Sequence, residues 1–364
     1  MKDRMCKRLS SSYLVLCVVN AIASAAPTTQ PAHRSGPFIL GADISWVEED
    51  EANGTTYYDH DQRGDVFQIL RDHGFNYLRL RVFVNPGGER GYAATSKEAF
   101  CDLEHTKVMA KRARAVGVGV LLDFHYSDTW ADPGHQFKPA AWDKLDFPAL
   151  KQAVYDHTHT VLVAMKEQGT TPDMVQIGNE VSNGMLWPDG QAKDHFDNFA
   201  ELIKSGVAAA RDVDPSIKIV LHHDKGRSIK PVRAWLDNLI ARGVEFDIIG
   251  LSCNSDGPAE NWKATFDDLA ANFPRYGLIA AEYSYKKREL NDIAFNAPDR
   301  RGLGTFIWEP TRHHEAVFDP ADKAAPATQI TTRPSHRPRT GPFNTNDLIN
   351  LYPKMAQDYG ESQP

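Results

Sequence analysis

Short apolar runs recur along the chain and alternate with longer amphipathic stretches. The runs have the length and composition of buried strands in a parallel sheet. Between them, apolar residues spaced three or four apart predict helices, most clearly over Leu150–Met165 and Phe196–Val207, and a last helix is expected over Thr345–Ala356. The predicted strands are Phe38–Asp43, Tyr77–Phe83, Val118–Phe124, Met174–Asn179, Ile217–Leu221, Phe246–Leu251, Leu278–Glu282 and Leu303–Trp308.

Regular alternation of strand and helix predicts a parallel sheet covered by helices. Glycines stand where helices should end, in His73-Gly74, Val116-Gly117 and Arg242-Gly243. About eight repeats over this length favour closure into a barrel over an open sheet. Neither GxGxxG nor GxxxxGKS/T follows the first run, which weakens a nucleotide-binding alternative. We therefore predict a single α/β domain, a (β/α)8 TIM barrel over residues 38–360.

The amino terminus has the features of an export signal. Basic residues precede an apolar stretch over Tyr13–Val19, and Ala23-Ser24-Ala25 offers a small-residue cleavage site. The stretch is short for a stable bilayer anchor, although an uncleaved anchor is the alternative. We expect a signal peptide at residues 1–25, a short lead-in at 26–37, and a secreted or periplasmic mature protein.

Two loops stand out by composition. Trp46–Gly54 is strongly acidic and follows a predicted strand, so we expect a solvated loop. Within a long loop at about 311–343, residues 324–341 are rich in Pro, Thr, Arg and Ala without periodicity. Because a helix must still dock after it, we expect this stretch to pass over the catalytic face.

Charge and cysteine content exclude several classes of function. A net charge of -7 gives no basic surface for a nucleic acid partner. Cys6 and Cys17 would leave with the signal, and we expect Cys101 and Cys253 to stay free thiols. Without a CxxC or HExxH motif, a zinc-centred mechanism has no support, so no metal and no cofactor are predicted.

Two glutamates end two of the predicted strands. Glu180 follows the run Met174–Asn179, and Glu282 ends the run Leu278–Glu282. Active sites of α/β barrels lie at the carboxyl ends of their strands. Glycoside hydrolysis needs one acid that protonates the leaving oxygen and a second that attacks the sugar or activates water. Alternatively, each glutamate is an ordinary strand-end residue.

Other polar side chains end neighbouring strands. Residues two apart in a strand share a face, so Arg79 with Arg81, and Asp123 with His125, should point the same way. Inward arginines need carboxylate partners, and a salt-bridge network in the barrel core is one interpretation. The functional interpretation adds that an arginine beside Glu282 holds it ionised, while a less polar environment keeps a proton on Glu180. The remaining candidates at strand ends are Asp43, Asp128 and Asn179.

Aromatic residues follow several strand ends. The loop from Asp123 to Gly134 is polar and aromatic, and four tryptophans fall just beyond strands. Aromatic faces pack on the apolar faces of sugars, so we expect these tryptophans to line a sugar cleft, although single tryptophans are more often core. They are Trp130, Trp142, Trp187 and Trp308.

Five segments together resemble the endo-β-1,4-galactanases of glycoside hydrolase family 53. They are Gly41–Gly54, Asn76–Pro86, Leu121–Gln136, Val175–Pro188 and Gly304–Pro310. The resemblance implies a retaining (β/α)8 glycosidase with Glu180 as acid/base and Glu282 as nucleophile. It also matches Arg79 to the second-strand arginine and His125 to the third-strand histidine.

The chain departs from the family pattern after three strands. The usual Tyr-Tyr-Pro run, one tyrosine of which orients the nucleophile, is replaced by Cys253-Asn254-Ser255. Tyr283-Ser284-Tyr285 lacks the usual proline, and Thr311–His314 replaces an aromatic segment. With Cys253 in the tyrosine's place, we expect either weak activity on standard β-1,4-galactan or a compensating donor such as Tyr283, Tyr285 or Asn254.

The leading hypothesis is a secreted, monomeric, retaining endo-β-galactanase that acts on galactan or arabinogalactan. A second hypothesis is a carbohydrate-binding protein that kept the barrel but lost turnover. The third is a related β-glycanase with a different glycan specificity. Retention of both glutamates and of His125 favours an enzyme.

Overall fold

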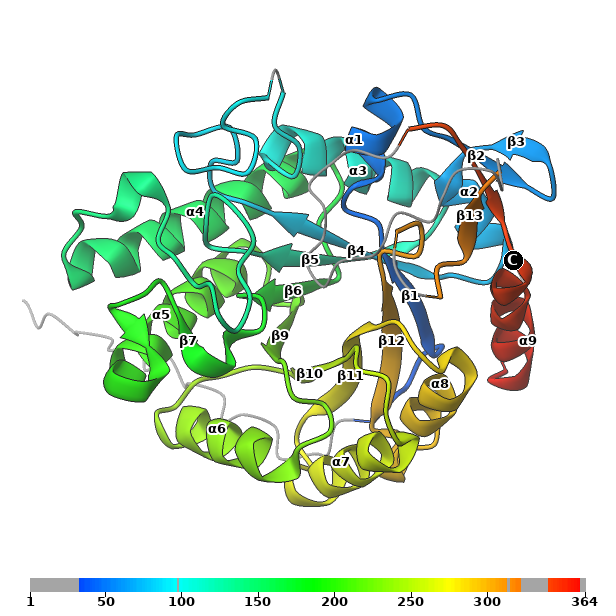
Figure 1. Cartoon of the computed structure of the whole chain (residues 1–364). Helices are drawn as coiled ribbons and strands as arrows, with labels where there is room; N and C mark the ends of the chain where they lie inside the picture. The colour runs from blue at the N-terminus through cyan, green and yellow to red at the C-terminus, as the bar shows by residue number, and fades with distance from the viewer. Residues whose placement is uncertain (1–32, 97, 313–314, 322–339, 361–364) are drawn as a thin grey trace, which may run out of the picture. The chain divides into compact units, whose positions relative to one another are not determined.

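The barrel predicted from the alternating pattern is present. The computed structural model describes residues 33–96, 98–312, 315–321 and 340–360, all within the compact unit Pro31–Pro364. Eight parallel strands close in the order β1-β12-β11-β10-β9-β6-β5-β4 (Figure 1). They are β1 Ile39–Asp43, β4 Tyr77–Val82, β5 Gly119–Phe124, β6 Met174–Ile177, β9 Lys218–His223, β10 Ile248–Cys253, β11 Gly277–Tyr283 and β12 Gly302–Trp308.

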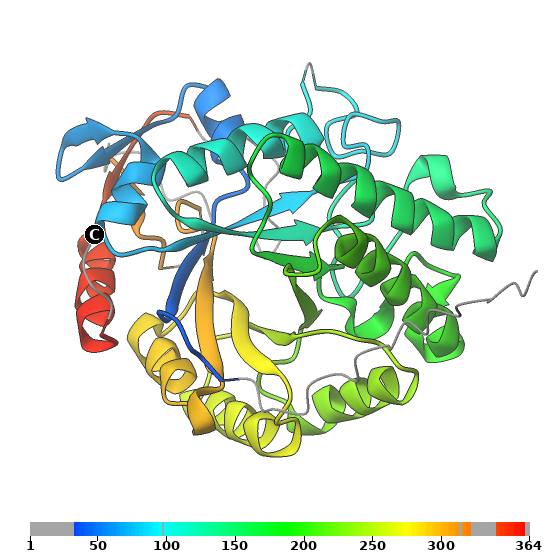
Figure 2. The same ribbon diagram turned by 180° about the vertical axis from the view of Figure 1, so that it is seen from behind.

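Helices surround this barrel, as Figure 2 shows from behind. The two strongest helical predictions fall inside α4 and α5, and Gly74, Gly117 and Gly243 have φ of +90°, +78° and +70°. Aspartate side chains cap α2, α3 and α4 by accepting from backbone N–H groups of the first turn. The helices are α1 Val47–Ala52, α2 Val66–Asp72, α3 Leu103–Ala115, α4 Phe147–Glu167, α5 Ala192–Val213, α6 Ile229–Ala241, α7 Ala259–Asn272, α8 Lys287–Phe295 and α9 Leu351–Asp358.

The acidic segment expected as a solvated loop is instead the helix α1. Glu49 and Asp50 are 9% and 1% exposed, and Asp50 pairs with Arg312 from beyond the last barrel strand. Burial raises the pKa of both Glu48 and Glu49 to about 7. The prediction was wrong because a partner 262 residues away makes burial of a charge possible.

A second, four-stranded sheet was not predicted. It joins β2 and β3 to β13 and β14 (Figure 1), and so gives the predicted 311–343 loop two short strands. The last helix α9 begins after the predicted start because β14 and a 3-10 turn, Asp347–Asn350, precede it. The strands are β2 Thr56–Asp59, β3 Gln62–Gly64, β13 Phe318–Pro320 and β14 Pro342–Thr345. The predicted signal peptide and nearly all of residues 324–341 lie outside the described residues.

The apolar core has two layers. The larger fills the space between barrel and helices, and a smaller cluster of eight buried residues fills part of the barrel interior. A Cβ at Gly41 would lie 2.3 Å from the Phe306 ring, so glycine is needed there for that ring to fit inside the barrel. Cys101 and Cys253 are free and buried, as expected. No helix among the described residues combines the length and apolar character needed to cross a bilayer.

Candidate active site

A cleft of about 390 Å³ opens at the carboxyl ends of the barrel strands. It contains both predicted catalytic glutamates, together with the predicted residues Arg79, Arg81 and His125 and others that the sequence did not indicate. Its lining is Arg79, Arg81, His125, Thr129, Trp130, Ala131, Asp132, His135, Phe137, Asn179, Glu180, Asn254, Glu282 and Trp308.

Glu282 reaches the cleft through an irregularity in β11. Leu278 and Ala280 pack outward against the helices, so regular alternation would also turn Glu282 outward. The pairing with β10 instead skips Ala281, and Ser252 lies opposite Glu282. This extra residue, a β-bulge, turns Glu282 into the barrel, where 6% of its surface is exposed.

Two donors hold the Glu282 carboxylate. Arg79 Nη1 lies 2.9 Å from Oε1, and Asn254 Nδ2 lies 3.1 Å from Oε2. Burial raises the pKa of Glu282, and Arg79 opposes that rise without cancelling it. The predicted arginine contact is therefore present, but it limits rather than reverses the effect of burial.

Arg79 is the centre of a buried ionic network. Its guanidinium donates at 2.8 Å to each of Asp43, Asp123 and Asn179, in addition to Glu282. Although burial opposes it, Arg79 lowers the pKa of Asp123 to about 2. Both interpretations of the inward arginines are thus satisfied, because the salt-bridge network of the core includes the glutamate itself.

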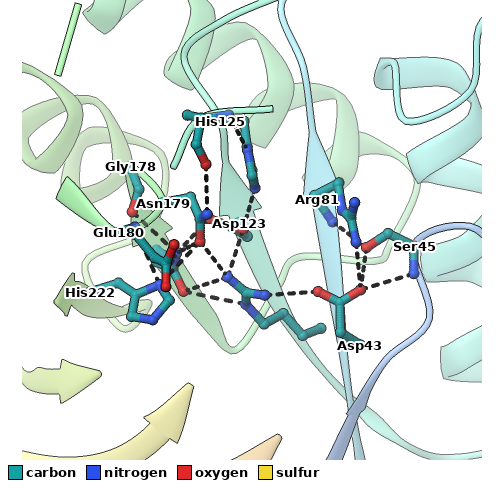
Figure 3. Close-up of polar contacts among 12 residues, drawn as sticks. Asp43, Ser45, Arg81, Asp123, His125, Gly178, Asn179, Glu180 and His222 are labelled. Atoms are coloured by element: carbon teal, nitrogen blue, oxygen red, sulfur yellow. Dashed lines mark hydrogen bonds and ion pairs between the residues drawn. The ribbon is translucent and has the colours of Figure 1, made fainter. Parts of the chain in front are cut away.

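Arg81 joins this network from the next inward position of β4. Its Nη2 lies 2.5 Å from Glu309 Oε1 and 3.4 Å from Asp43 Oδ1, and its guanidinium lies 4.9 Å from the Trp46 ring centre. Figure 3 shows Asp43 between Ser45 and Arg81, which together fix its carboxylate. Glu309 was missed, although it directly follows Trp308 at a strand end, the signal used elsewhere.

Glu180 lies in a turn after β6 and is partly exposed to the cleft. Its backbone has φ +47° and ψ +48°, in the left-handed region that non-glycine residues rarely adopt. Ser252 Oγ donates to its Oε1 at 2.5 Å. Burial and the negative charge of Glu282 raise the pKa of Glu180 well above its ordinary value, as predicted for a proton donor.

His125 and Asp128 have different roles. His125 Nδ1 accepts from the backbone N–H of Ala131 at 3.0 Å, so its Nε2 carries the hydrogen that Asp123 accepts at 2.9 Å. The ring lines the cleft. Asp128 does not line it; its carboxylate accepts from the backbone N–H groups of Asn85 and Ala140 and so supports two loops.

The tryptophan prediction holds for two of four residues. Trp130 and Trp308 line the cleft, and Trp130 packs 5.0 Å from the Trp46 ring. Trp142 is 8% exposed in the core, so its assignment to the cleft was wrong. Trp187 was also misassigned, since it packs edge-on against Phe137, which does line the cleft.

The alternation of outward and inward side chains along β10 decides which residue of the altered segment faces the cleft. Cys253 points outward into the core with 1% exposure, so its thiol does not face the cleft. Asn254, the next residue, lines the cleft and is the compensating donor to Glu282. Tyr283 is excluded, because its hydroxyl bonds Tyr352 in the core.

Only one His/Cys/Asp/Glu group among the described residues has the spacing of metal ligands. It is Asp59, His60 and His73, none of which lines the cleft. Asp59 Oδ1 lies 2.9 Å from His60 Nδ1 and 3.0 Å from His73 Nε2, and it accepts from Thr345 Oγ1 at 2.9 Å. These contacts hold β2, the end of α2 and β14 together, and they explain why the three side chains lie close to one another.

Comparison with known proteins identifies the family. A model of glycosyl hydrolase family 53 matches residues 39–294. The chain belongs to this family. It is similar to arabinogalactan endo-β-1,4-galactanase A of Emericella nidulans, 32% identical over 305 residues that cover 74% of this chain and 84% of that protein. It is also 42% identical over 252 residues to an uncharacterized protein of Niallia circulans, covering 66% of this chain and 65% of that protein.

Solved structures of family 53 agree. The catalytic domain from Ignisphaera aggregans superposes with a TM-score of 0.71 at 33% identity, covering 79% of this chain and 89% of that one. A fungal β-1,4-galactanase structure gives 0.67 at 29% identity, covering 76% and 90%. Membership of family 53 makes the protein a glycosidase.

Proposed function

We propose that this family 53 glycosidase is an exported, monomeric endo-β-1,4-galactanase that hydrolyses galactan or arabinogalactan with retention of configuration. The observation that carries the proposal is the contrast between the two cleft glutamates. Glu282 accepts from the Arg79 guanidinium, whereas Glu180 accepts from a neutral hydroxyl, that of Ser252. An ionised and a protonated carboxyl in one cleft are what glycoside hydrolysis requires.

In the first step, Glu282 attacks the anomeric carbon and Glu180 gives its proton to the departing glycosidic oxygen. The product is a glycosyl ester on Glu282 and a free sugar end. Esterification removes the negative charge that raises the pKa of Glu180, so that pKa falls and Glu180, having given up its proton, stays ionised and is available as a base. In the second step it takes a proton from water, the water oxygen attacks the anomeric carbon, and Glu282 leaves as carboxylate.

The choice of galactan is supported by the named relatives, which are arabinogalactan endo-β-1,4-galactanases. The cleft adds aromatic surfaces at Trp130, Phe137 and Trp308, which suit the apolar faces of sugar rings. Export is supported by the amino-terminal pattern of residues 1–25.

One assay tests the reaction and its stereochemistry. The purified mature protein is incubated with β-1,4-galactan, and products are sized while proton NMR follows the newly formed reducing ends. We expect internal cleavage and products that first appear as the β-anomer. First appearance of the α-anomer would rule out the double displacement, and an unchanged polymer would rule out the galactanase assignment. The mass of the protein in solution tests the monomer.

A different β-glycanase specificity is the second candidate, and Asn254 favours it. Asn254, in a segment that departs from the family pattern, lines the cleft beside Glu282 and contributes to its shape there. Mannans and β-glucans in the same assay decide between the two. Turnover of one of these at a higher kcat/KM than galactan would replace the proposed substrate and leave the mechanism standing.

A further inference from the structure

Three buried side chains link Arg79 to the acid Glu180 through four consecutive hydrogen bonds. The order is Arg79, Gln176, His222, Ser252 and then Glu180. Gln176 and His222 are fully buried, and Ser252 is 7% exposed. The direction in which each bond donates can be worked out from one end, because an arginine only donates.

Gln176 has a fixed orientation. Arg79 Nε and Nη2 donate to its Oε1 at 3.3 and 3.2 Å, so the amide nitrogen must face the other way. There Nε2 donates to Asp123 Oδ1 at 2.6 Å, and its second N–H lies 3.1 Å from Gly178 O, 3.2 Å from Asn179 Oδ1 and 3.1 Å from His222 Nδ1. The first link therefore places only N–H groups of Gln176, and no acceptor of that residue, beside the histidine ring.

His222 carries its hydrogen on Nε2. The backbone N–H of Glu180 also points at Nδ1, at 3.4 Å, and a backbone amide cannot reverse its role. Asn179 Oδ1, 3.1 Å from Nδ1, accepts from Arg79 Nη2 and would accept from the ring only in the opposite tautomer, in which the N–H of Glu180 would have no acceptor on the ring. Burial and Arg79 hold the pKa of His222 well below its ordinary value, so the ring is neutral with one hydrogen.

Ser252 accepts a hydrogen bond from His222 and donates the next one to Glu180. His222 Nε2 lies 2.9 Å from Ser252 Oγ, so the hydroxyl accepts there and its own hydrogen is free for Glu180 Oε1, 2.5 Å away. Figure 3 shows Glu180 beside His222 at this end of the network. Oε1 of Glu180 is thereby kept as an acceptor.

We propose that His222 and Ser252 are positioning residues that keep the catalytic proton of Glu180 on Oε2, the oxygen not bonded to Ser252. A carboxylic acid with a fixed proton meets the glycosidic oxygen in one geometry, instead of dividing its time between two. This inference rests on the proposed role of Glu180 as acid. Arg79 then acts on both glutamates. It contacts Glu282 directly, and it orients Gln176, the first side chain of the hydrogen-bonded chain that ends at Glu180.

The first experiment compares Ser252→Ala with Ser252→Thr. The alanine variant should lose about tenfold in kcat/KM on galactan and little on an aryl glycoside with a good leaving group, because only poor leaving groups need the proton. The threonine variant keeps the hydroxyl and should recover activity. Ser205→Ala, which removes a partly buried hydroxyl bonded within α5, is the matched control. Equal loss on both substrates, or no loss, would overturn the proposal.

The pH profile gives a readout that a merely structural role would not move. The charged groups facing Glu180 are Glu282, Asp224 and Arg79. Ser252 stabilises the ionised form, so its removal raises the pKa of Glu180 further and should move the alkaline limb to higher pH. An alkaline limb that stays in place, or moves to lower pH, contradicts the proposed hydrogen bond from Ser252 to Glu180.

The second experiment tests direction without any substrate. In full-length protein with 15N-labelled histidine, NMR should show His222 as the Nε2–H tautomer, while a hydrogen on Nδ1 would reverse the chain and overturn the proposal. His222→Gln places an amide N–H near Nε2 and should retain more activity than His222→Leu. The tautomer of His222 is measured without turnover. If the wild-type protein were inactive on every glycan, the proposed function would fail, and the NMR result would still show in which direction the hydrogen bonds run.

Discussion

The two halves of the barrel rim are built from different chemistry. The half over β1, β4, β5 and β6 is ionic: Asp43, Arg79 and Asp123 form a buried network. The half over β9 to β12 offers neutral polar and aromatic groups, among them His222, Ser252, Asn254 and Trp308. Each glutamate is bonded across the divide, Glu282 by Arg79 and Glu180 by Ser252. Each glutamate thus accepts a hydrogen bond from the opposite half, from a charged donor at Glu282 and from a neutral donor at Glu180.

The largest effect is expected from removing the glutamate that the ionic half controls. Glu282→Ala should abolish turnover, by about 10⁴-fold or more, because no nucleophile remains. Added azide should partly restore activity by entering the vacated space and give a glycosyl azide of inverted configuration. A glycosyl azide of retained configuration would instead assign Glu282 as the acid and exchange the two roles.

Removing the proton from the other glutamate should have the next largest effect. Glu180→Gln should lower kcat on galactan by about 10²- to 10⁴-fold and spare substrates with very good leaving groups. The alkaline limb of the pH–rate profile, which reports deprotonation of this raised-pKa acid, should disappear. Equal loss on activated and natural substrates would count against the acid role.

Arg79→Met tests the hydrogen bond between Arg79, in the ionic half of the rim, and Glu282. Loss of the cation raises the pKa of Glu282, so the acidic limb of the profile should move to higher pH and kcat/KM should fall by about 10²-fold or more. The variant also leaves Asp43 and Asp123 without their partner, so its thermal unfolding is measured beside that of wild type. An acidic limb that does not move in a folded variant would contradict the assignment.

A smaller effect is expected from the neutral half. Asn254→Ala removes one donor to Glu282 and should lower kcat/KM by about tenfold. Cys253→Ser, one residue earlier, alters a side chain that faces the core and should change stability more than activity. The comparison fails if the cysteine variant loses more activity per folded molecule than the asparagine variant does.

The smallest effect is expected at the aromatic wall. Trp130→Ala should raise KM for the polymer a few-fold and leave a short activated glycoside nearly unaffected, because the ring contacts sugar units away from the reacting bond. Trp142→Phe, in the core, is the matched control and should leave KM unchanged. Unchanged polymer affinity in Trp130→Ala would remove this residue from the cleft.

The sequence predicted the barrel because its strands are short, mostly apolar runs that alternate with amphipathic helical stretches. It missed β3 because Gln62–Gly64 is short, polar and exposed. The acidic segment was misplaced because its partner Arg312 is far away in the chain. Such pairings depend on the closed barrel and leave no local pattern.

Within the site, sequence reasoning found both glutamates, Arg79 and His125, and missed Gln176, His222 and Ser252, which connect Arg79 to Glu180. Glu180, Glu282, Arg79 and His125 are chemically conspicuous at strand ends. Ser252 and Gln176 are ordinary strand residues by composition, and the predicted fifth strand stopped at Leu221, one residue before His222. The inward orientation of Glu282 depends on the β11 bulge, which strict alternation does not anticipate.

The left-handed backbone of Glu180 bears on whether a glutamate would persist at this position if hydrolysis were no longer under selection. A side chain in this conformation costs about 1–2 kcal/mol, and its buried acid adds a desolvation penalty. Glycine would relieve both, so we infer that Glu180→Gly folds at least as stably as the parent, which its free energy of unfolding would show. Folding therefore gives natural selection no reason to keep a glutamate here. In a lineage that had given up hydrolysis, this codon would be among the first to drift.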